Sequence, residues 1–388
     1  MSGSRGRRIA INAGLAAASL ALTLGALELG FRLLLGDDYL IGKQILTFAR
    51  RHHHAAGNRG ADCFPTNPSG VFHEVDPVRW KGALLLETMH YQPIPRAMLR
   101  HTPWCVEFTN NRSGFRGADF ANERRPGSLR VVVLGDSFAY GVGVADTETL
   151  AVQLETALAE RGPSRDVEVI NLGEPGIDTS RQLAHWHEHR KLRPDVVVLA
   201  YVLNDVSRAE GVGERNAAAD LVMLRPGHLE TGGWRGSALV RFVSHRLARR
   251  RAHDGTLAGY LEAFDAERNA EGLAETEARL GELAREVAAD GAELLVALYP
   301  ILYRLGDDYP LAPAHETLGA IFDRLDLAWI DLRTDAFAGQ PAEALHVHPL
   351  DHHPNALAHG LAARAIADEM ARRGLSAVRN PNADPVQH

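Results

Sequence analysis

Short apolar segments alternate with longer stretches of helical periodicity from about residue 129 onward, and this alternation restricts the fold more than any other feature. The apolar segments are LRVVVL (129–134), VEVIN (167–171), DVVVLAY (195–201), ELLVAL (293–298) and AWIDL (328–332). Strands that are apolar on both faces are typical of a parallel sheet with helices on both sides. The pattern therefore predicts a three-layer α/β/α sandwich with about five parallel strands.

A second constraint is the N-terminal segment IAINAGLAAASLALTLGAL (9–27), which has 19 positions without a charge. At about 1.5 Å per residue, a helix of this length nearly crosses a hydrocarbon layer of about 30 Å. Arg5, Arg7 and Arg8 precede it, so the positive-inside rule places the N-terminus in the cytoplasm and most of the chain outside. We favour a retained anchor over residues 9–35, in a single-pass protein of the cell inner membrane with a periplasmic main domain. The alternatives are a cleaved signal peptide and a buried core helix.

These features divide the chain into parts. The predicted order is a cytoplasmic N-terminus (1–8), the anchor (9–35), an extracytoplasmic spacer and capping segment (36–125), the α/β domain (126–375) and a disordered tail (376–388). A Gly-rich and Arg-rich stretch at 206–265 is predicted to be an insertion. Within it, SALVRFVSHRLARRR (237–251) predicts a basic amphipathic helix, either on an anionic membrane surface or simply solvated.

Charge and cysteine content limit the partners of the chain. The 42 basic and 49 acidic side chains give a net charge of −7, which excludes a general binder of nucleic acid or other polyanions. Cys63 and Cys105 both follow the apolar segment, on the side of the membrane where disulfides persist. A bridge between them and two separate buried thiols both remain open.

Residues suited to nucleophilic catalysis follow the predicted strands. Ser137 comes directly after the first strand, and ligands bind at the carboxyl ends of strands in open α/β sheets. A serine hydroxyl needs a base to take its proton and donors to hold the developing oxyanion. The segment NLGEPG (171–176) and Asn204 offer donors, whereas DHHPN (351–355) offers a base and a carboxylate. Pro354 suits the first turn of the last helix.

Together these segments resemble, in content and order, the four sequence blocks of the SGNH or GDSL hydrolases, over about residues 126–375. The resemblance implies the flavodoxin-like fold of that family, hydrolysis of acyl esters and no cofactor. It also implies that Ser137 is the nucleophile, His353 the base and Asp351 the acid that orients it. The implied oxyanion hole consists of the N–H groups of Ser137 and Gly176 and the side chain of Asn204. The preceding NNRSGFRG (110–117) is similar to the segment before the catalytic domain in membrane-anchored bacterial members.

Two positions depart from the family's pattern. Val202 stands where the third block usually has glycine, which affects the backbone around Asn204. Leu350 stands three residues before His353, where the family often has the acid, so Asp351 would act from a shorter spacing. The residues that compete for these roles are His348 and His352 for the base, and Asp331 and Asp335 for the acid.

The histidines raise the alternative of a metal site. His185 and His189 stand four apart on a predicted helix, a spacing found in zinc sites. No H-E-x-x-H motif accompanies this pair, so surface histidines are the better interpretation, and no metal is expected. A second group crowds one segment near the C-terminus: His346, His348, His352, His353 and His359.

The leading hypothesis is a membrane-anchored extracytoplasmic serine esterase that hydrolyses acyl esters, in particular acetyl esters, on a carbohydrate or small molecule. The same groups could pass the acyl group to a sugar hydroxyl, as an O-acyltransferase that modifies envelope or exported polysaccharide. One membrane span offers no donor channel, so transfer would require a membrane acyltransferase partner or an acylated donor. A third hypothesis is a non-catalytic glycan-binding module of an envelope assembly.

Overall fold

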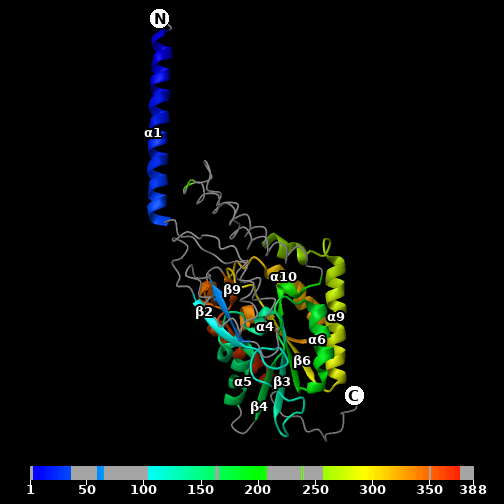
Figure 1. The fold of residues 1–388 in the computed structure, drawn as a ribbon. Helices are drawn as coiled ribbons and strands as arrows, with labels where there is room; N and C mark the ends of the chain where they lie inside the picture. The colour runs from blue at the N-terminus through cyan, green and yellow to red at the C-terminus, as the bar shows by residue number, and fades with distance from the viewer. Residues whose placement is uncertain are drawn as a thin grey trace.

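A five-stranded parallel sheet lies at the centre of the fold, in the order β4-β3-β5-β6-β7 (Figure 1). Its strands are β3 (Leu129–Gly135), β4 (Val167–Asn171), β5 (Val196–Val202), β6 (Glu293–Tyr299) and β7 (Ala328–Asp331). They coincide with the five predicted segments, and the predicted fold class is confirmed. The computed structural model describes residues 3–35, 59–64, 104–161, 166–207, 237, 239, 257–348 and 351–375. The predicted tail, most of the insertion and the amphipathic helix predicted at 237–251 lie outside the described residues.

Helices cover both faces of the sheet. On one face α5 (Leu150–Glu160) packs against α12 (Ala356–Arg372), and on the other α6 (Thr179–His189) packs against α9 (Ala270–Ala289) (Figure 1). Side chains at successive strand positions point to opposite faces, and Val131, Val132 and Val133 of β3 are all 0–1% exposed. Both faces of the central strands are therefore sealed from water, which explains the unbroken apolar runs.

Short elements complete the domain, with α10 (Ala312–Arg324) beside β7. They are α4 (Ser137–Tyr140), α11 (Leu332–Asp335), the 3-10 turns η3 (Asp146–Glu148), η4 (Arg190–Leu192), η5 (Leu203–Asp205) and η8 (Ala342–Ala344), and the hairpin of β8 (His346–His348) and β9 (Asp351–Pro354).

The last helix begins two residues later than predicted. Asn355 is its N-cap, and the Asn355 side chain accepts a hydrogen bond from the backbone N–H of Ala358 at 3.1 Å. Pro354 belongs to β9 and not to the first helical turn. The asparagine cap fixes the start because it satisfies an N–H that no helical carbonyl can reach.

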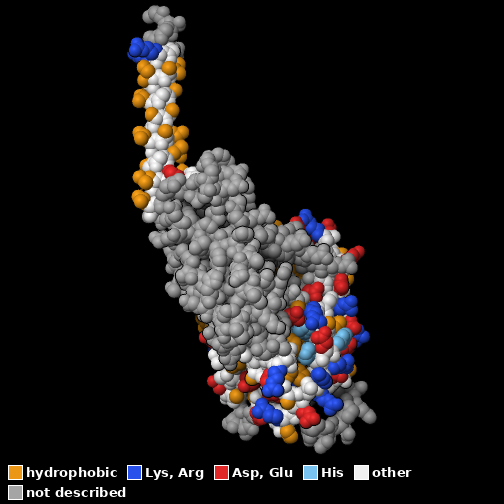
Figure 2. Space-filling model, viewed as in Figure 1, with side chains coloured by type: hydrophobic (Ala, Val, Ile, Leu, Met, Phe, Trp, Pro, Cys, Tyr) orange, Lys and Arg blue, Asp and Glu red, His pale blue; other side chains and the backbone are white. Residues whose placement is uncertain are grey.

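The N-terminal helix α1 (Gly3–Leu35) contains a 25-residue stretch, Gly6–Gly30, with a mean hydropathy of 1.7. Its apolar side chains are exposed, Leu15 by 65% and Leu22 by 76%, and Figure 2 shows them along the visible length of the helix. At about 1.5 Å per residue the stretch is long enough to cross a bilayer, as an anchor or as a signal sequence. Near its end, Glu28 accepts hydrogen bonds from Ser237 Oγ at 2.6 Å and from the N–H of Leu239 at 3.0 Å.

Part of the segment predicted as a spacer and cap packs into the α/β domain. Strand β2 (Trp104–Thr109) pairs with β1 (Arg59–Phe64), and the chain then continues into the predicted NNRSGFRG segment. Phe108, Phe115 and Arg116 are 2%, 5% and 2% exposed, and Phe115 joins the main hydrophobic core. The structural core therefore receives residues from before the predicted domain start at residue 126.

The antiparallel pairing of β1 with β2 places Cys63 directly opposite Cys105. Opposite residues of an antiparallel ladder have Cα atoms about 4.5–5.5 Å apart, a separation that a disulfide can span. We predict a Cys63–Cys105 disulfide in protein exported from the cytoplasm, detected as a linked peptide pair by mass spectrometry without reduction. Protein kept in a reducing cytoplasm is the control, and two alkylated thiols in the exported form would contradict the prediction.

Candidate active site

Ser137 is positioned by a tight turn at the carboxyl end of β3. It is the first residue of α4, and Asp136 is the N-cap of that helix. Gly135, the last residue of β3, lies so close to β5 that an added Cβ would stand 2.5 Å from the carbonyl oxygen of Ala200. Only glycine allows this approach. The sequence Gly-Asp-Ser thus turns the chain sharply from a buried strand into a helix that begins with the serine.

His353 reaches Ser137 from the other end of the sequence. It lies in β9, and its Nε2 atom is 3.0 Å from Ser137 Oγ. The ring also meets the edge of Phe138 on α4, with the ring centroids 5.7 Å apart. Among the described side chains, this is the histidine that the structure brings within hydrogen-bond distance of the serine hydroxyl.

Asp136 ties the serine to the loop after β5. Its carboxylate accepts hydrogen bonds from the N–H of Phe138 at 2.8 Å and from Asn204 Nδ2 at 3.1 Å. It also accepts from Ser137 Oγ at 3.2 Å, and it is fully buried. No role was expected for Asp136 from the sequence, although an aspartate just before a helix is a recognised N-cap signal.

The donors at this site have unequal capacities. The Ser137 hydroxyl has one proton, so it can donate to Asp136 or to His353, but not to both at once. The Asn204 amide has two N–H groups, and the bond to Asp136 uses one of them. The second can donate to an oxygen atom placed beside the serine. Val202, where the family usually has glycine, ends β5 as a buried residue, and its N–H donates to Asp205 at 2.8 Å.

The loop after β4 lies against α4. The Asn171 side chain donates to the carbonyl oxygen of Ala139 at 3.0 Å and accepts from the N–H of Gly173 at 2.8 Å. A Cβ on Gly173 would collide with the backbone of Tyr140. Gly176, further along the loop, has a φ of 82°, and an added Cβ would meet no atom within 4 Å. This glycine therefore borders open space.

The structure describes the side chains of only some of the residues considered for orienting the base. Asp351 lies two residues before His353 in β9 and pairs with His348, but its side chain lies outside the described residues, as does that of His348. The alternatives have other partners. Asp331 Oδ1 is 3.0 Å from His315 Nδ1, and Asp335 accepts from the N–H of Asp331 at 3.1 Å. His352 stacks on His346, with ring centroids 4.2 Å apart.

Two buried carboxyl groups shape the electrostatics beneath the serine. Burial raises the pKa of Asp136, against the opposing effects of its hydrogen bonds and of the charge on His353. Burial, and then the charge of Asp136, raise the pKa of Asp205 well above its ordinary value. Burial also raises the pKa of Tyr299, with Asp136 adding to the shift. The protonated form of Asp205 is thus favoured, which limits the negative charge under the site.

The histidines expected on the surface of α6 have structural partners. His185 is buried, with Nε2 at 2.5 Å from Glu174 Oε2 and Nδ1 at 3.3 Å from the carbonyl oxygen of Leu172. His189 Nδ1 is 2.9 Å from the carbonyl oxygen of His185. The burial of His185 corrects the interpretation of this pair as exposed. Both ring nitrogens of His185 already have hydrogen-bond partners, so the His185–His189 pair does not offer two unoccupied nitrogen ligands to a zinc ion.

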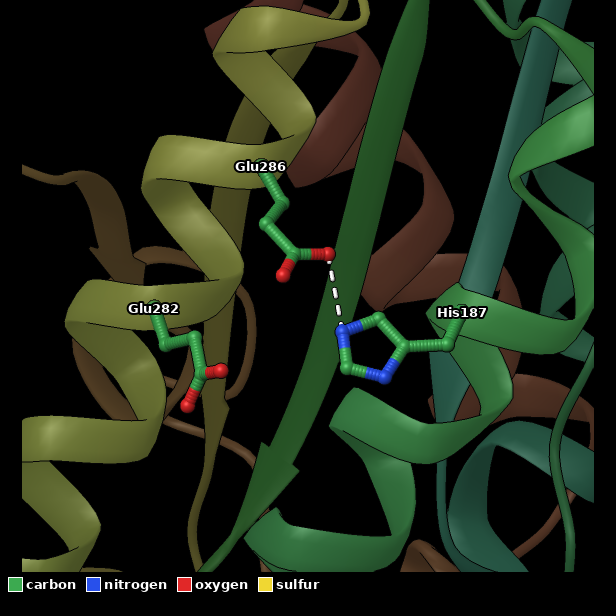
Figure 3. A group of neighbouring side chains, drawn as sticks. All are labelled: His187, Glu282 and Glu286. Carbon is green, nitrogen blue, oxygen red and sulfur yellow. Dashed lines mark ion pairs between the residues drawn. The ribbon is translucent and has the colours of Figure 1, made fainter.

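A different group could be considered for a metal ion. His187 on α6 faces Glu282 and Glu286 on α9, with ligand atoms within 4.8 Å of one another (Figure 3). His187 Nε2 is 2.8 Å from Glu286 Oε2, as the dashed line shows. Arg190 is 3.6 Å from Glu286, and Arg279 is 3.2 Å from Glu282. Ion pairs between the two helices and within α9 account for the group, and the guanidinium groups oppose a further cation.

Comparisons with known proteins match the chain to one protein family. The GDSL-like Lipase/Acylhydrolase family matches residues 133–361, which include Ser137, Gly176, Asn204 and His353. No curated protein sequence matches the chain. Three crystal structures resemble it at low identity.

The first of these structures is a lipase/acylhydrolase from Enterococcus faecalis (17% identity, 63% of this chain and 96% of that chain covered, TM-score 0.37). The second is a catalytic mutant of an acetylxylan esterase from Geobacillus stearothermophilus (17%, 64% and 96%, TM-score 0.39). The third is a two-domain esterase active on acetylated mannans (15%, 67% and 52%, TM-score 0.39).

A first prediction concerns the Asn204 amide. We expect Asn204→Ala to lower kcat by about 10²–10³-fold, or roughly 2.7–4 kcal/mol of transition-state stabilisation, as removal of one oxyanion donor does elsewhere. The measurement is steady-state hydrolysis of an activated ester, with the folded fraction checked by circular dichroism. Wild-type kcat in a folded Asn204→Ala variant would refute the donor role.

A second prediction concerns the raised pKa of Asp205. Ionisation of this buried acid costs the folded state more than the unfolded state, so wild-type stability falls as the pH rises from about 4 through the raised pKa. Asn at this position keeps an acceptor for the N–H of Val202 and removes the charge. We expect Asp205→Asn to be more stable than wild type at pH 8, with the gain vanishing near pH 4. Urea unfolding at both pH values measures it, and a gain that is unchanged by pH would contradict it.

Proposed function

The chain belongs to the GDSL-like lipase/acylhydrolase family, and we propose that it is a membrane-anchored, extracytoplasmic serine esterase that removes acetyl groups from a carbohydrate. Hydrolysis of carboxylic esters is the activity of this family. The anchor, the location, the acetyl group and the carbohydrate are the parts that we add.

In the proposed acylation step, Ser137 Oγ attacks the ester carbonyl carbon while its proton passes to His353 Nε2. The distance of 3.0 Å between these atoms allows direct transfer. The carbonyl oxygen becomes an oxyanion, which receives hydrogen bonds from the second N–H of Asn204 and from the backbone N–H groups of Ser137 and Gly176. Collapse of this intermediate expels the alcohol, which takes the proton back from His353.

Deacylation repeats the sequence with water. His353 removes a proton from a water molecule, whose oxygen attacks the acyl carbon and re-forms the oxyanion. When the Ser137 ester bond breaks, the carboxylic acid leaves, and Oγ recovers its proton from His353. Asp351 is proposed to orient the imidazole from β9, two residues away along the same strand.

The contact between Ser137 Oγ and His353 Nε2 is the observation that carries the proposal. The two residues are 216 positions apart in sequence, so chance proximity on one local segment does not explain the contact. A serine and an imidazole at this distance form the minimal pair for covalent acyl transfer.

The location and substrate rest on the architecture of the chain. Helix α1 is long and apolar enough to span a bilayer, and basic residues precede its apolar stretch. A retained α1 would place the α/β domain outside the cytoplasm, where acetylated envelope or exported polysaccharide is the available ester. Oxidation of Cys63 and Cys105 in exported protein would support the same location independently. The proposed division is an anchor at 9–35 and a hydrolase domain at 126–375, joined by residues 36–125 and carrying an insertion at 206–265.

The test is a series of p-nitrophenyl esters of increasing acyl length, assayed with the full chain in detergent. We expect the highest kcat/KM with acetate, falling by about tenfold or more by octanoate, because longer chains do not fit a site built for acetyl groups. Ser137→Ala should lose at least about 10⁴-fold in kcat while keeping the wild-type melting temperature. A preference for long chains would replace the acetyl proposal with a lipid ester.

Acetylated oligosaccharides complete the test. Release of acetate measured by mass spectrometry supports the carbohydrate assignment. Formation of a new ester on an added acceptor glycan, faster than hydrolysis, would favour the O-acyltransferase. Full hydrolysis by Ser137→Ala would refute the serine mechanism, and failure of Ser137 to react with a fluorophosphonate in folded protein would favour a non-catalytic glycan-binding module.

A further inference from the structure

Arg116 lies fully buried beside the nucleophile helix, in the NNRSGFRG segment that the proposed mechanism does not use. Its side chain is 0% exposed. The guanidinium donates from Nε to Asp146 Oδ1 at 2.7 Å, from Nη1 to the carbonyl oxygen of Gly141 at 3.0 Å, and from Nη2 to the carbonyl oxygen of Val144. Gly141 and Val144 belong to the loop that follows α4, and Asp146 is the first residue of η3 at the end of that loop.

The bonding pattern explains why an arginine occupies this position. A buried loop must satisfy its backbone carbonyl groups, and a guanidinium offers five N–H donors in one rigid plane. Lysine would supply a single point charge and could not bridge the three acceptors in the same way. The planar group also lies over the rings of Phe108 and Tyr140, at 5.2 Å and 5.3 Å from their centroids.

The loop held by Arg116 is bonded to the nucleophile itself. The N–H groups of Gly141 and Val142 donate to the carbonyl oxygen of Ser137 at 3.1 Å and 3.2 Å. From the same segment as Arg116, Asn110 Oδ1 accepts a hydrogen bond from the Tyr140 hydroxyl at 2.9 Å. Because α4 is only one turn long and the loop is bonded to the Ser137 carbonyl oxygen, a shift of the loop would move Ser137.

Arg116 also shares surroundings with the base. His359 on α12 is fully buried, and burial together with the charges of Arg116 and His353 lowers its pKa to about 3. The His359 ring is therefore neutral beside both groups.

We propose that Arg116 is a positioning residue for ester hydrolysis. Its hydrogen bonds to the loop after α4 keep Ser137 Oγ within hydrogen-bond distance of His353 Nε2. This inference rests on the proposed function, because it assigns Arg116 a part in the same reaction. A displacement of about 1 Å at a reacting atom can cost about 10²-fold in rate. Arg116 need not touch the substrate to have an effect of this size.

The experiment compares Arg116→Met and Arg116→Lys with the wild-type full chain. The active fraction is counted by complete labelling of Ser137 with a fluorophosphonate, and kcat is expressed per labelled site. We expect Arg116→Met to lower kcat by about 10–100-fold, with KM changed by less than about twofold. The kcat of Arg116→Lys should lie between those of Arg116→Met and the wild type. Guanidinium added at millimolar concentration should restore part of the activity of Arg116→Ala, but not that of Ser137→Ala.

Arg130 provides a matched control. Its side chain is also 0% exposed and pairs with Glu168 at 2.7 Å, and its guanidinium also binds backbone carbonyls, those of Asn122, Glu123 and Leu192. It lies at the start of β3, whereas Ser137 follows the opposite end of that strand. Arg130→Met removes a comparable buried cation, so it should lower the melting temperature to a similar degree and leave kcat per labelled site unchanged.

The outcomes separate the two proposals. If Arg116→Met and Arg130→Met have the same kcat per labelled site, Arg116 supports only the fold, and the positioning role is overturned. If Arg116→Met does not fold, the positioning role is tested by Arg116→Lys and by guanidinium rescue of Arg116→Ala. Wild-type kcat in Arg116→Lys would also overturn the positioning role. If the wild type hydrolyses no ester, the proposed function fails. The rate at which fluorophosphonate labels Ser137 then still compares the Arg116 variants with Arg130→Met.

Discussion

A carboxylate that is fully removed from water is stable only when donors replace its hydration, and Asp136 meets this condition with three groups from the site. The N–H of Phe138 fixes the start of α4, and the amide of Asn204 fixes the loop after β5. The hydroxyl of Ser137 completes the set. Because the carboxylate cannot lose the bonds from Phe138 and Asn204 cheaply, its burial holds the first turn of α4 and the oxyanion donor in one arrangement. The geometry of the site is therefore a consequence of satisfying one buried charge.

The fold could be predicted because its main signals are local. Parallel strands between two helical layers must be apolar on both faces, and the runs at 129–134 and 195–201 show this directly. The pairing of Ser137 with His353 was expected from the resemblance to the SGNH or GDSL hydrolases, because His353 lies in the β8–β9 hairpin and follows no strand of the parallel sheet. The predicted start of α12 was two residues too early, because Pro354 and Asn355 both suit a helix N-terminus. The observed N-cap at Asn355 decides between them.

Other features of the site depend on contacts between distant residues, which local patterns do not encode. Nothing near Arg116 in the sequence indicates that three acceptors from residues 141–146 converge on it. The same holds for His185, which was expected on the surface because no metal-site motif accompanies it, but which lies buried against Glu174. Both cases involve a polar side chain whose partners come from another element. Tertiary hydrogen bonds offset the cost of burying such polar groups, and a sequence pattern does not show these bonds. Polar side chains are therefore expected to be exposed unless the structure shows otherwise.

The competition for the serine proton links these constraints to catalysis. Asp136 Oδ2 already accepts from Asn204, and its contact with Ser137 Oγ is 3.2 Å, against 3.0 Å for His353 Nε2. The hydroxyl therefore has two acceptors at similar distances, and the imidazole is the one that can serve as the base. Once it holds the proton, its positive charge attracts the carboxylate, an effect seen in the opposing influence of His353 on the pKa of Asp136. The attraction is mutual, so Asp136 stabilises the protonated base in the same step in which it gives up the serine hydroxyl.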